Sequence, residues 1–239
     1  MSIFQNMSIH LLSPFFYAAF VEGLRFLPRI PDNKVMIWCR TVHNISLSVL
    51  SLMLFVLSVI GTYMDQKFNS VDALLCDEYD KHNNIIKITA VVFLLSKYIE
   101  WGDTLFLHLS NKPITMLQYT HHMSTVILTY VACIRITISP HSFVFVGTNT
   151  FIHTLMYWYF AFPAGILQRY RKMITIGQLV QHVLCLFVLI HTSLIEGCEQ
   201  PEDVNLFGLS LYSMYLIFFL AFYLKTYTPK KNTVEGKYS

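Results

Sequence analysis

Residues 41–64 read TVHNISLSVLSLMLFVLSVIGTYM, 24 residues without one Asp, Glu, Lys or Arg. An α-helix needs about 20 mostly apolar residues to cross the hydrocarbon core of a bilayer. A segment that crosses must be helical, because lipid offers no hydrogen-bond partner to an unpaired backbone. This stretch therefore predicts a transmembrane helix.

Similar runs recur along the chain. Residues 1–21, 114–134, 136–168, 173–195 and 204–224 carry no charge, and 88–109 carry only Lys97, Glu100 and Asp103. Together they predict seven spans, at 5–24, 42–63, 86–109, 114–134, 141–162, 173–194 and 205–225. The first run lacks a basic leader and a clear cleavage site, so we interpret it as a retained helix rather than a signal peptide.

The overall composition agrees with a membrane protein. Of 239 residues, 54% are hydrophobic and 13% are charged, whereas about a quarter of a soluble domain is charged. The apolar and aromatic content argues against disorder, and a net charge of +3 without a basic stripe argues against nucleic-acid binding. The sequence thus predicts an all-α polytopic membrane protein, with one domain over 1–228 and a flexible polar tail at 229–239.

The remaining charges alternate between successive loops. One set of loops and flanking ends is basic, and contains Arg25, Arg29, Lys34, Arg40, Lys112, Arg169, Arg171, Lys172, Lys225, Lys230, Lys231 and Lys237. The other set contains only Lys67, Lys81, Lys87 and Arg135 against nine acids, Asp65, Asp72, Asp77, Glu78, Asp80, Glu196, Glu199, Glu202 and Asp203. Because cytosolic loops are enriched in Lys and Arg, this pattern predicts a luminal N-terminus and a cytosolic C-terminus.

Two of the five cysteines lie in loops on the acidic side. Cys76 follows the second span and Cys198 the sixth, and this side faces an oxidising compartment in the secretory pathway. We expect a Cys76–Cys198 disulfide, with two free loop cysteines as the alternative. Cys39, Cys133 and Cys185 lie in or beside spans and are expected to be inert packing residues.

A first polar cluster interrupts the span at 86–109. Lys97, Glu100 and Thr104 share one helix face, with Asp103 beside them. Ionisable groups at membrane depth are expensive and are therefore functional candidates. The cluster is interpreted either as an ion-paired scaffold or as part of a catalytic site.

A second cluster opens the span at 114–134, where Gln118, His121 and His122 lie within two turns. Adjacent histidines diverge by about 100° around a helix, so one can face a cavity while the other contacts a neighbouring helix. Gln118 can face either imidazole. The grouping favours chemistry over two hydrogen-bonded core histidines. A metal site stays open, with further ligands available from Glu100, Asp103 and His153.

A third cluster lies in the span at 141–162, where Asn149, His153 and Tyr157 follow one helix stripe. Asn149 could fix the tautomer of His153. In the next span, Gln178 and Gln181 form a polar pair that could join helices or line a cavity. The histidines interpreted as ordinary polar or packing residues are His10, His43, His82, His108, His141 and His191.

Taken in order, these clusters resemble the motifs of the ELO family of very-long-chain fatty acid elongases. The matching patterns are Lys97-x-x-Glu100-x-x-Asp103-Thr104, Gln118-x-x-His121-His122, Asn149-x-x-x-His153-x-x-Met156-Tyr157 and Thr175-x-x-Gln178-x-x-Gln181. The chain departs from the family at Gln118, where the histidine box usually begins with His, and at Phe160, where Tyr is usual. A Gln at this position is similar to a subset of elongases with polyunsaturated substrates.

The resemblance implies condensation of a long-chain, and by Gln118 a polyunsaturated, acyl-CoA with malonyl-CoA. The reaction releases CO2 and CoA and yields a 3-ketoacyl-CoA, without a metal or cofactor. The family mechanism is thought to be ping-pong, through an acyl-imidazole. Carried over, His121 is the acyl acceptor and His153 the acid/base or malonyl-positioning group. The orienting and supporting residues are His122, Gln118, Asn149, Lys97, Glu100, Asp103, Tyr157, Gln178 and Gln181.

The resemblance also implies surroundings and partners. Six of the seven helices would form a barrel-like bundle around an acyl-CoA chamber in the endoplasmic reticulum membrane. Basic residues on the cytosolic side could bind CoA phosphates, namely Lys112, Arg169, Arg171 and Lys172. Expected partners are the lipid bilayer, acyl-CoA and malonyl-CoA. Other elongation-cycle enzymes or a second copy of the chain are further candidates, and no nucleic acid is expected.

Two other classes are weighed against this interpretation. A membrane di-iron desaturase or hydroxylase needs about eight histidine ligands, and only one degenerate histidine box is found here. A seven-helix receptor or transporter would place its polar groups near mid-membrane, whereas Gln118, His121 and His122 lie close to a predicted cytosolic loop.

Overall fold

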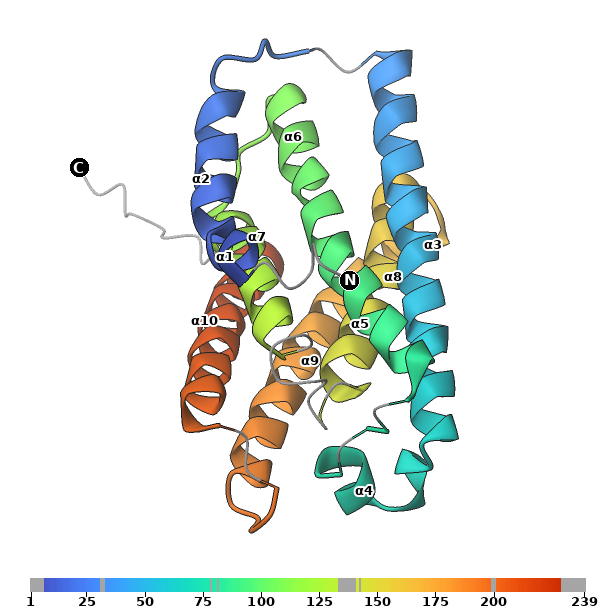
Figure 1. Ribbon diagram of the computed structural model, residues 1–239. Coiled ribbons are helices and arrows are strands. Elements are labelled where there is room, and N and C mark those ends of the chain that lie inside the picture. The colour runs from blue at the N-terminus through green and yellow to red at the C-terminus, as the bar shows by residue number, and fades with distance from the viewer. Residues whose placement is uncertain are drawn as a thin grey trace, which may run out of the picture.

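A computed structural model describes residues 7–30, 33–77, 79–80, 82–132, 141, 143–198 and 201–228, which form helices and loops and no strand (Figure 1). The helices are α1 Met7–Leu11, α2 Ser13–Leu24, α3 Lys34–Met64, α4 Val71–Leu75, α5 Asn84–Ile99, α6 Trp101–Leu109, α7 Met116–Tyr130, α8 Thr148–Ala161, α9 Arg171–Thr192 and α10 Glu202–Tyr227. Shorter helical turns are η1 Lys67–Asn69, η3 Phe143–Gly147 and η4 Ile166–Tyr170. The tail at 229–239 lies outside the described residues.

Three described helical stretches are long and apolar enough to cross a membrane. They are α3, the continuous stretch Ile166–Thr192 that ends with α9, and α10. They correspond to the spans expected at 42–63, 173–194 and 205–225, of which the second ends two residues early, at Thr192. The described chain is therefore an all-helical membrane protein that crosses the bilayer more than once.

The other four expected spans are interrupted or shorter than expected. The first is divided between α1 and α2, and Pro14 lies in the first turn of α2. Proline has no backbone N–H to donate to the preceding turn, so α1 cannot continue regularly through this point. The third is divided at Glu100 between α5 and α6. The fourth is represented by α7 and the π-helical residues 131–132 that follow it, while 133–134 lie outside the described residues. The fifth is represented by the π-helical turn η3, which continues directly into α8. Counting uncharged residues cannot detect such interruptions.

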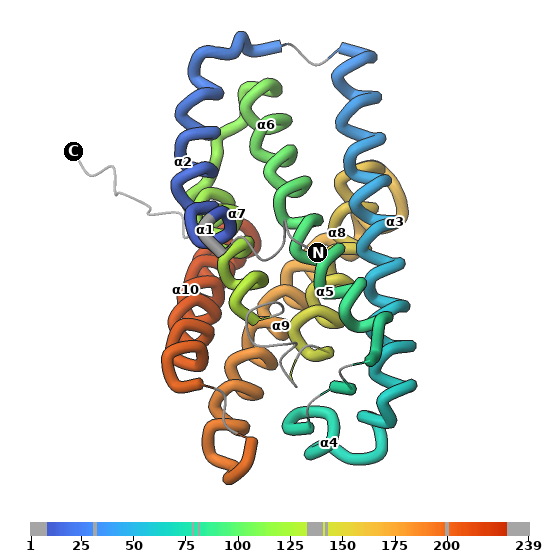
Figure 2. Tube along the Cα trace, in the orientation of Figure 1, coloured from blue at the N-terminus to red at the C-terminus, as the bar shows by residue number. Residues whose placement is uncertain are grey.

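The helices pack as a bundle with two distinct ends (Figure 2). Helix α3 packs against α5 and α8, α9 against α10, and α2 against α7. At one end, the loop after α2 meets the turn after α6, where the Ile30 amide donates to the Leu109 carbonyl at 2.9 Å. The Thr115 hydroxyl then accepts from the Gln118 amide and caps α7, which places the histidines one turn inside this end.

The opposite end is held by a disulfide between Cys76 and Cys198, which confirms that prediction. Beside it, the Thr62 hydroxyl lies 3.1 Å from the hydroxyl of Tyr79. Burial raises the pKa of Tyr79 to about 12, so this hydroxyl stays protonated at neutral pH. The disulfide joins the loop after α4 to the loop after α9, and the Thr62–Tyr79 contact joins this region to α3.

Of the three remaining cysteines, the structure describes two, and both are unpaired. Cys39 is partly exposed and Cys185 is buried, and both are free thiols. This agrees with their expected role as packing residues. Cys133 lies outside the described residues.

Removing the disulfide should lower thermal stability. The bond closes a loop across a sequence separation of 122 residues, and a disulfide that closes a long loop stabilises a protein by about 2–4 kcal/mol. We expect Cys76→Ser to lower the midpoint of thermal unfolding in detergent by roughly 5–10 °C. Cys39→Ser, which removes a free thiol, is the matched control and should have little effect. Two free thiols at 76 and 198 in a non-reduced peptide map would contradict the bond.

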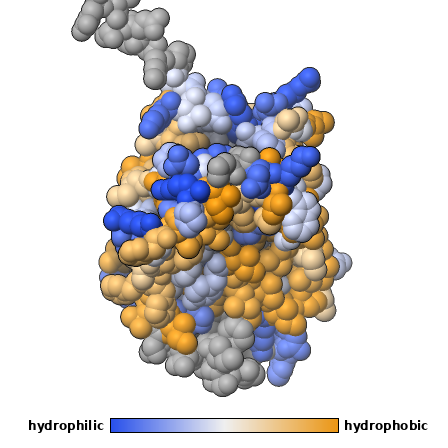
Figure 3. All heavy atoms as spheres, turned by 90° about the horizontal axis from the view of Figure 1, so that it is seen from above, coloured by the Kyte–Doolittle hydropathy of each residue, from blue (hydrophilic) through white to orange (hydrophobic). Residues whose placement is uncertain are grey.

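The bundle exposes apolar side chains and buries charged ones, the opposite of the distribution in a soluble protein. Large apolar side chains on the long helices are exposed, among them Met53, Phe187 and Ile217, as expected of surfaces that contact lipid. Figure 3 views the bundle from above, with hydrophilic side chains gathered over the upper half of the view and apolar ones over the lower half and the sides. Inside, Lys97 and Glu100 are each 2% exposed. Buried charge of this kind indicates a functional site.

Candidate active site

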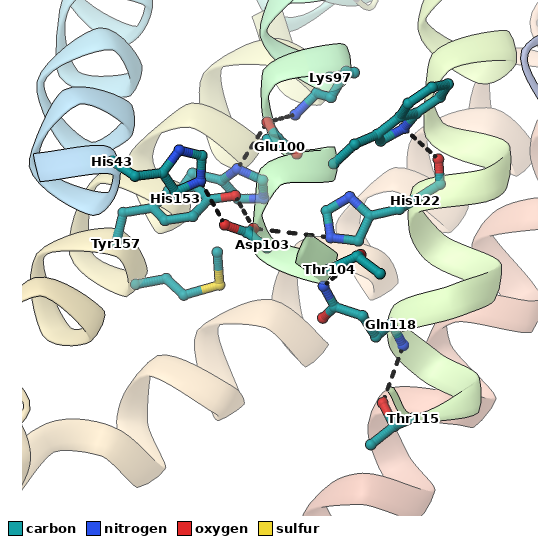
Figure 4. A network of polar contacts seen from close by, with 12 residues as sticks. His43, Lys97, Glu100, Asp103, Thr104, Thr115, Gln118, His122, His153 and Tyr157 are labelled. Carbon is teal, nitrogen blue, oxygen red and sulfur yellow. Dashed lines mark hydrogen bonds and ion pairs between the residues drawn. The ribbon is translucent and has the colours of Figure 1, made fainter. Parts of the chain in front are cut away.

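The site is built around the interruption between α5 and α6. Glu100 lies at this point, and Lys97 lies one turn earlier on α5. The Lys97 ammonium donates to Glu100 Oε1 at 2.8 Å (Figure 4). It also donates to Asn149 Oδ1 of α8 at 2.9 Å. A buried ion pair is tolerated only when further hydrogen bonds satisfy it, and Asn149 supplies one.

His153 lies one turn after Asn149 and is held from two sides. Its Nε2 is 3.3 Å from Asn149 Nδ2, and its Nδ1 is 3.5 Å from Glu100 Oε1. Because Lys97 donates to the Asn149 oxygen, the amide nitrogen faces the imidazole, and Nε2 must accept. In the neutral ring the proton therefore lies on Nδ1, toward Glu100. Lys97 thus sets the tautomer of His153 through Asn149.

Asp103 joins three further helices. Its Oδ1 is 2.9 Å from His43 Nε2 of α3, and its Oδ2 accepts from the Tyr157 hydroxyl of α8 at 2.7 Å. On the other side, His122 Nε2 of α7 lies 3.9 Å from Oδ2. Figure 4 shows these side chains converging on Asp103 from both sides. Reasoning from sequence missed the role of His43, because 60 residues separate it from its partner.

The two box histidines point in different directions, and their rings meet at 81°. The His122 ring faces Asp103, and the Trp101 indole donates to its backbone carbonyl at 3.2 Å. The His121 ring packs edge-on against Tyr215 of α10, with centroids 5.0 Å apart. Neither nitrogen of His121 has a hydrogen-bond partner among the described residues, and protein atoms enclose Nδ1. This leaves Nε2 as the nitrogen that can reach a ligand.

Gln118 does not contact either imidazole through a described hydrogen bond. Its Nε2 donates to Thr104 Oγ1 at 3.5 Å, and the same oxygen lies 2.7 Å from the Tyr17 hydroxyl of α2. Gln118 therefore links α7 to α6 and, through Thr104, to α2. Separately, Gln178 Nε2 of α9 donates to the sulfur of Met156 at 3.3 Å.

These groups surround one cavity of about 460 Å³. Its wall includes the expected site residues Glu100, Asp103, Gln118, His121, His122, Asn149, His153, Tyr157, Gln178 and Gln181. Lys97 lines an adjoining cavity of about 40 Å³ instead. Pro113, Thr115 and Tyr227 also line the larger cavity, which we call the chamber. Pro113 lies in the connection before α7, Thr115 caps α7 and Tyr227 ends α10, so the chamber extends to the end of the bundle where α7 begins.

The expected phosphate-binding residues are less closely grouped. Arg171 lines the chamber where α9 begins. Lys112, Arg169 and Lys172 are exposed and are absent from the chamber wall in the described part of the chain. The Lys172 ammonium lies 5.7 Å from the ring centroid of Tyr223.

One chamber residue escaped the sequence motifs. His182 of α9 is buried and lines the chamber. It follows Gln181 directly and lies four residues after Gln178, so the helical spacing of the polar pair was a signal that could have identified it.

Within the described residues, no group of three or more His, Cys, Asp or Glu side chains is arranged to hold a metal ion. The contacts of His43, His122 and His153 are instead with single carboxylates.

The fold and the site together define a helical membrane protein with a buried chamber lined by imidazole, carboxylate and amide groups. The sequence model of the ELO family, described as the GNS1/SUR4 family, matches residues 2–235. The chain belongs to this family.

Relatives from several animals carry related names. Very long chain fatty acid elongase 5 of Tachysurus fulvidraco is 33% identical over 227 residues, covering 88% of this chain and 73% of that protein. The human protein of the same name is 31% identical, with coverages of 85% and 70%. Long chain fatty acid elongase 2 of Caenorhabditis elegans is 34% identical over 155 residues, covering 60% of this chain and 55% of that protein.

Proposed function

We propose that this protein is a condensing enzyme of fatty acid elongation, which joins a long-chain acyl-CoA to malonyl-CoA. Its relatives are named fatty acid elongases. The observation that carries the proposal is the chamber, because it unites His121 of α7 with His153 of α8. One imidazole has an unpartnered nitrogen and the other is held in a single tautomer.

In the first half of the reaction, His121 Nε2 adds to the thioester carbonyl of the acyl-CoA. A carbon–nitrogen bond forms, the carbon–sulfur bond breaks, and the imidazole proton leaves with CoA as its thiol. His121 suits this role because its nitrogens have no described hydrogen-bond partner. His153 is less suited, since Asn149 and Glu100 occupy both of its nitrogens. Histidine is an established covalent nucleophile.

In the second half, the malonyl group loses CO2. The electron pair of the broken bond becomes an enolate at the thioester, which attacks the acyl carbon and displaces His121, whose imidazole takes up one proton from water. The product is a 3-ketoacyl-CoA that is two carbons longer. Because decarboxylation drives the bond formation, the proposed reaction requires no metal or cofactor. His153 would position the malonyl group or exchange a proton with it.

The acyl tail would extend away from the histidines through the bundle. The cavity of about 40 Å³ shares His121, Asn149 and Gln181 with the chamber. A third cavity, of about 30 Å³, is lined by four residues that also line the cavity of about 40 Å³, namely Leu128, Ala132, Phe145 and Tyr212. The cavity of about 30 Å³, farthest from the chamber, is lined mostly by apolar side chains, which suits the end of a long alkyl chain. We also propose that the acyl chain is polyunsaturated, because Gln118 occupies the first position of the histidine box.

We infer the orientation and location from the two ends of the bundle. Seven membrane segments with a luminal N-terminus would place the Cys76–Cys198 disulfide in an oxidising lumen. The chamber entrance would then face the cytosol, where CoA phosphates could meet Arg171 and the neighbouring Lys112, Arg169 and Lys172. Such a protein would lie in the endoplasmic reticulum membrane and take its substrates from the cytosolic side. Association with other elongation-cycle enzymes or a second copy would fit the same setting.

The proposal predicts that purified protein releases labelled CO2 from malonyl-CoA only when a long-chain acyl-CoA is present. Mass spectrometry should detect the 3-ketoacyl-CoA with two added carbons. CO2 release that is independent of acyl-CoA, or a desaturated product of unchanged length, would contradict the proposal.

A further inference from the structure

His182 stands in the chamber without a described polar partner. It is 3% exposed and lines both the chamber and the cavity of about 40 Å³. Neither of its nitrogens has a hydrogen bond to a described residue, and Nδ1 is fully enclosed. Nε2 is not among the enclosed atoms, so it is the nitrogen of His182 that can meet a ligand in the chamber.

The ring of His182 lies beside two aromatic side chains of α10 that also contact His121. Its ring lies 4.9 Å from the ring of Phe219 and 5.6 Å from that of Tyr215. His121 packs against the same two rings, at 6.3 Å and 5.0 Å. The two imidazoles, from α9 and α7, therefore share one aromatic surface of α10.

We propose that His182 is a further catalytic residue, whose Nε2–H donates a hydrogen bond to the carbonyl oxygen of the acyl group as it is transferred at His121. This inference rests on the proposed function. With the proton on Nε2, the enclosed Nδ1 carries only a lone pair, and no buried N–H lacks an acceptor. When His121 adds to the thioester, the carbonyl π electrons move onto oxygen. They return when the carbon–sulfur bond breaks.

The chemistry of the wall favours this role over a structural one. Phe219 and Tyr215 pack against the rings of both histidines, which leaves little room for water beside them. In a site with little water, a hydrogen bond to developing negative charge is much stronger than in solution. A histidine that only filled space here could be replaced by Phe without a kinetic effect.

The kinetic test compares substitutions of His182 in the full-length protein in detergent. His182→Phe should slow acylation by acyl-CoA alone about 10²- to 10³-fold, the effect of losing one such donor. His182→Gln, which keeps an N–H donor, should retain a rate within about tenfold of wild type. His191→Phe is the matched control, because His191 lies on the same helix and its ring stacks on Phe187. It should acylate at the wild-type rate.

A binding test covers the possibility that the Phe variant has no activity. A CoA thioether with a ketone oxygen at the acyl carbonyl position is compared with the same thioether lacking that oxygen. Wild type should bind the ketone analogue more tightly, and His182→Phe should lose this preference while binding the plain thioether normally. Equal preference in both proteins, or a Phe variant with the wild-type acylation rate, would overturn the inference.

The result is separable from the proposed function. If wild type releases no CO2 in the presence of acyl-CoA, the proposed function fails. If wild type elongates and His182→Phe elongates equally well, only the role of His182 fails.

Discussion

His121→Ala should abolish chain extension, lowering the rate of product formation by at least about 10³-fold, as expected for loss of a nucleophile. His121 is the box histidine with no described partner on either ring nitrogen, and Ala cannot carry an acyl group. The measurement is single-turnover formation of the 3-ketoacyl-CoA. It is combined with a mass search for an acyl adduct on the peptide that contains His121.

Substitution of His153, the other histidine of the proposed reaction, separates the two halves of that reaction. His153→Ala should still form the acyl adduct with acyl-CoA alone but should fail to release CO2 from malonyl-CoA. His191→Ala is the control and should form the product at the wild-type rate, because the His191 ring stacks on Phe187 and does not line the chamber. An adduct on His153, or wild-type acyl transfer by His121→Ala, would reject the assignment of the acyl acceptor.

Lys97→Met should destabilise the protein by about 3–5 kcal/mol, because it leaves the Glu100 carboxylate buried without its cation. Glu100 is 2% exposed, and its Oε2 has no hydrogen-bond partner among the described residues. The substitution also frees the Asn149 amide, which Lys97 holds toward His153. The expected fall in the thermal midpoint is about 10 °C, measured by unfolding in detergent.

A double variant distinguishes electrostatics from packing. Lys97→Met combined with Glu100→Gln removes both charges and should recover part of the lost stability, since the second change relieves the unpaired carboxylate. Lys34→Met is the surface control and should change stability by less than about 0.5 kcal/mol, because Lys34 is exposed at the start of α3. A double variant no more stable than Lys97→Met would show that charge is not the cause.

Much of the fold follows from local pattern. The uncharged runs place the long helices α3, α9 and α10 to within a few residues at most ends, although α3 begins at Lys34, eight residues before the expected span. The pattern could not show that Glu100 separates α5 from α6. At this boundary Glu100 faces His153, while Asp103, three residues later, contacts His43 and Tyr157.

The site was predicted where residues one helical turn apart act together. Lys97 with Glu100, and Asn149 with His153, are local pairs of this kind, and the structure places both in contact. Gln118 shows the limit of the same reasoning. Its spacing from His121 and His122 allowed a contact with either, but its amide reaches Thr104 of another helix. Spacing defines which residues share a face, and packing decides which neighbour that face meets.

The sequence alone determined the protein class, the long helices, the disulfide and the residues most suited to chemistry. These depend on composition and on the fixed geometry of single helices. Only the tertiary structure decided that Asp103 joins His43, His122 and Tyr157, and that His182 lies with His121 on one aromatic surface. Such contacts join residues far apart in the chain. They depend on how the helices are rotated and packed against each other, which is a property of the assembled bundle.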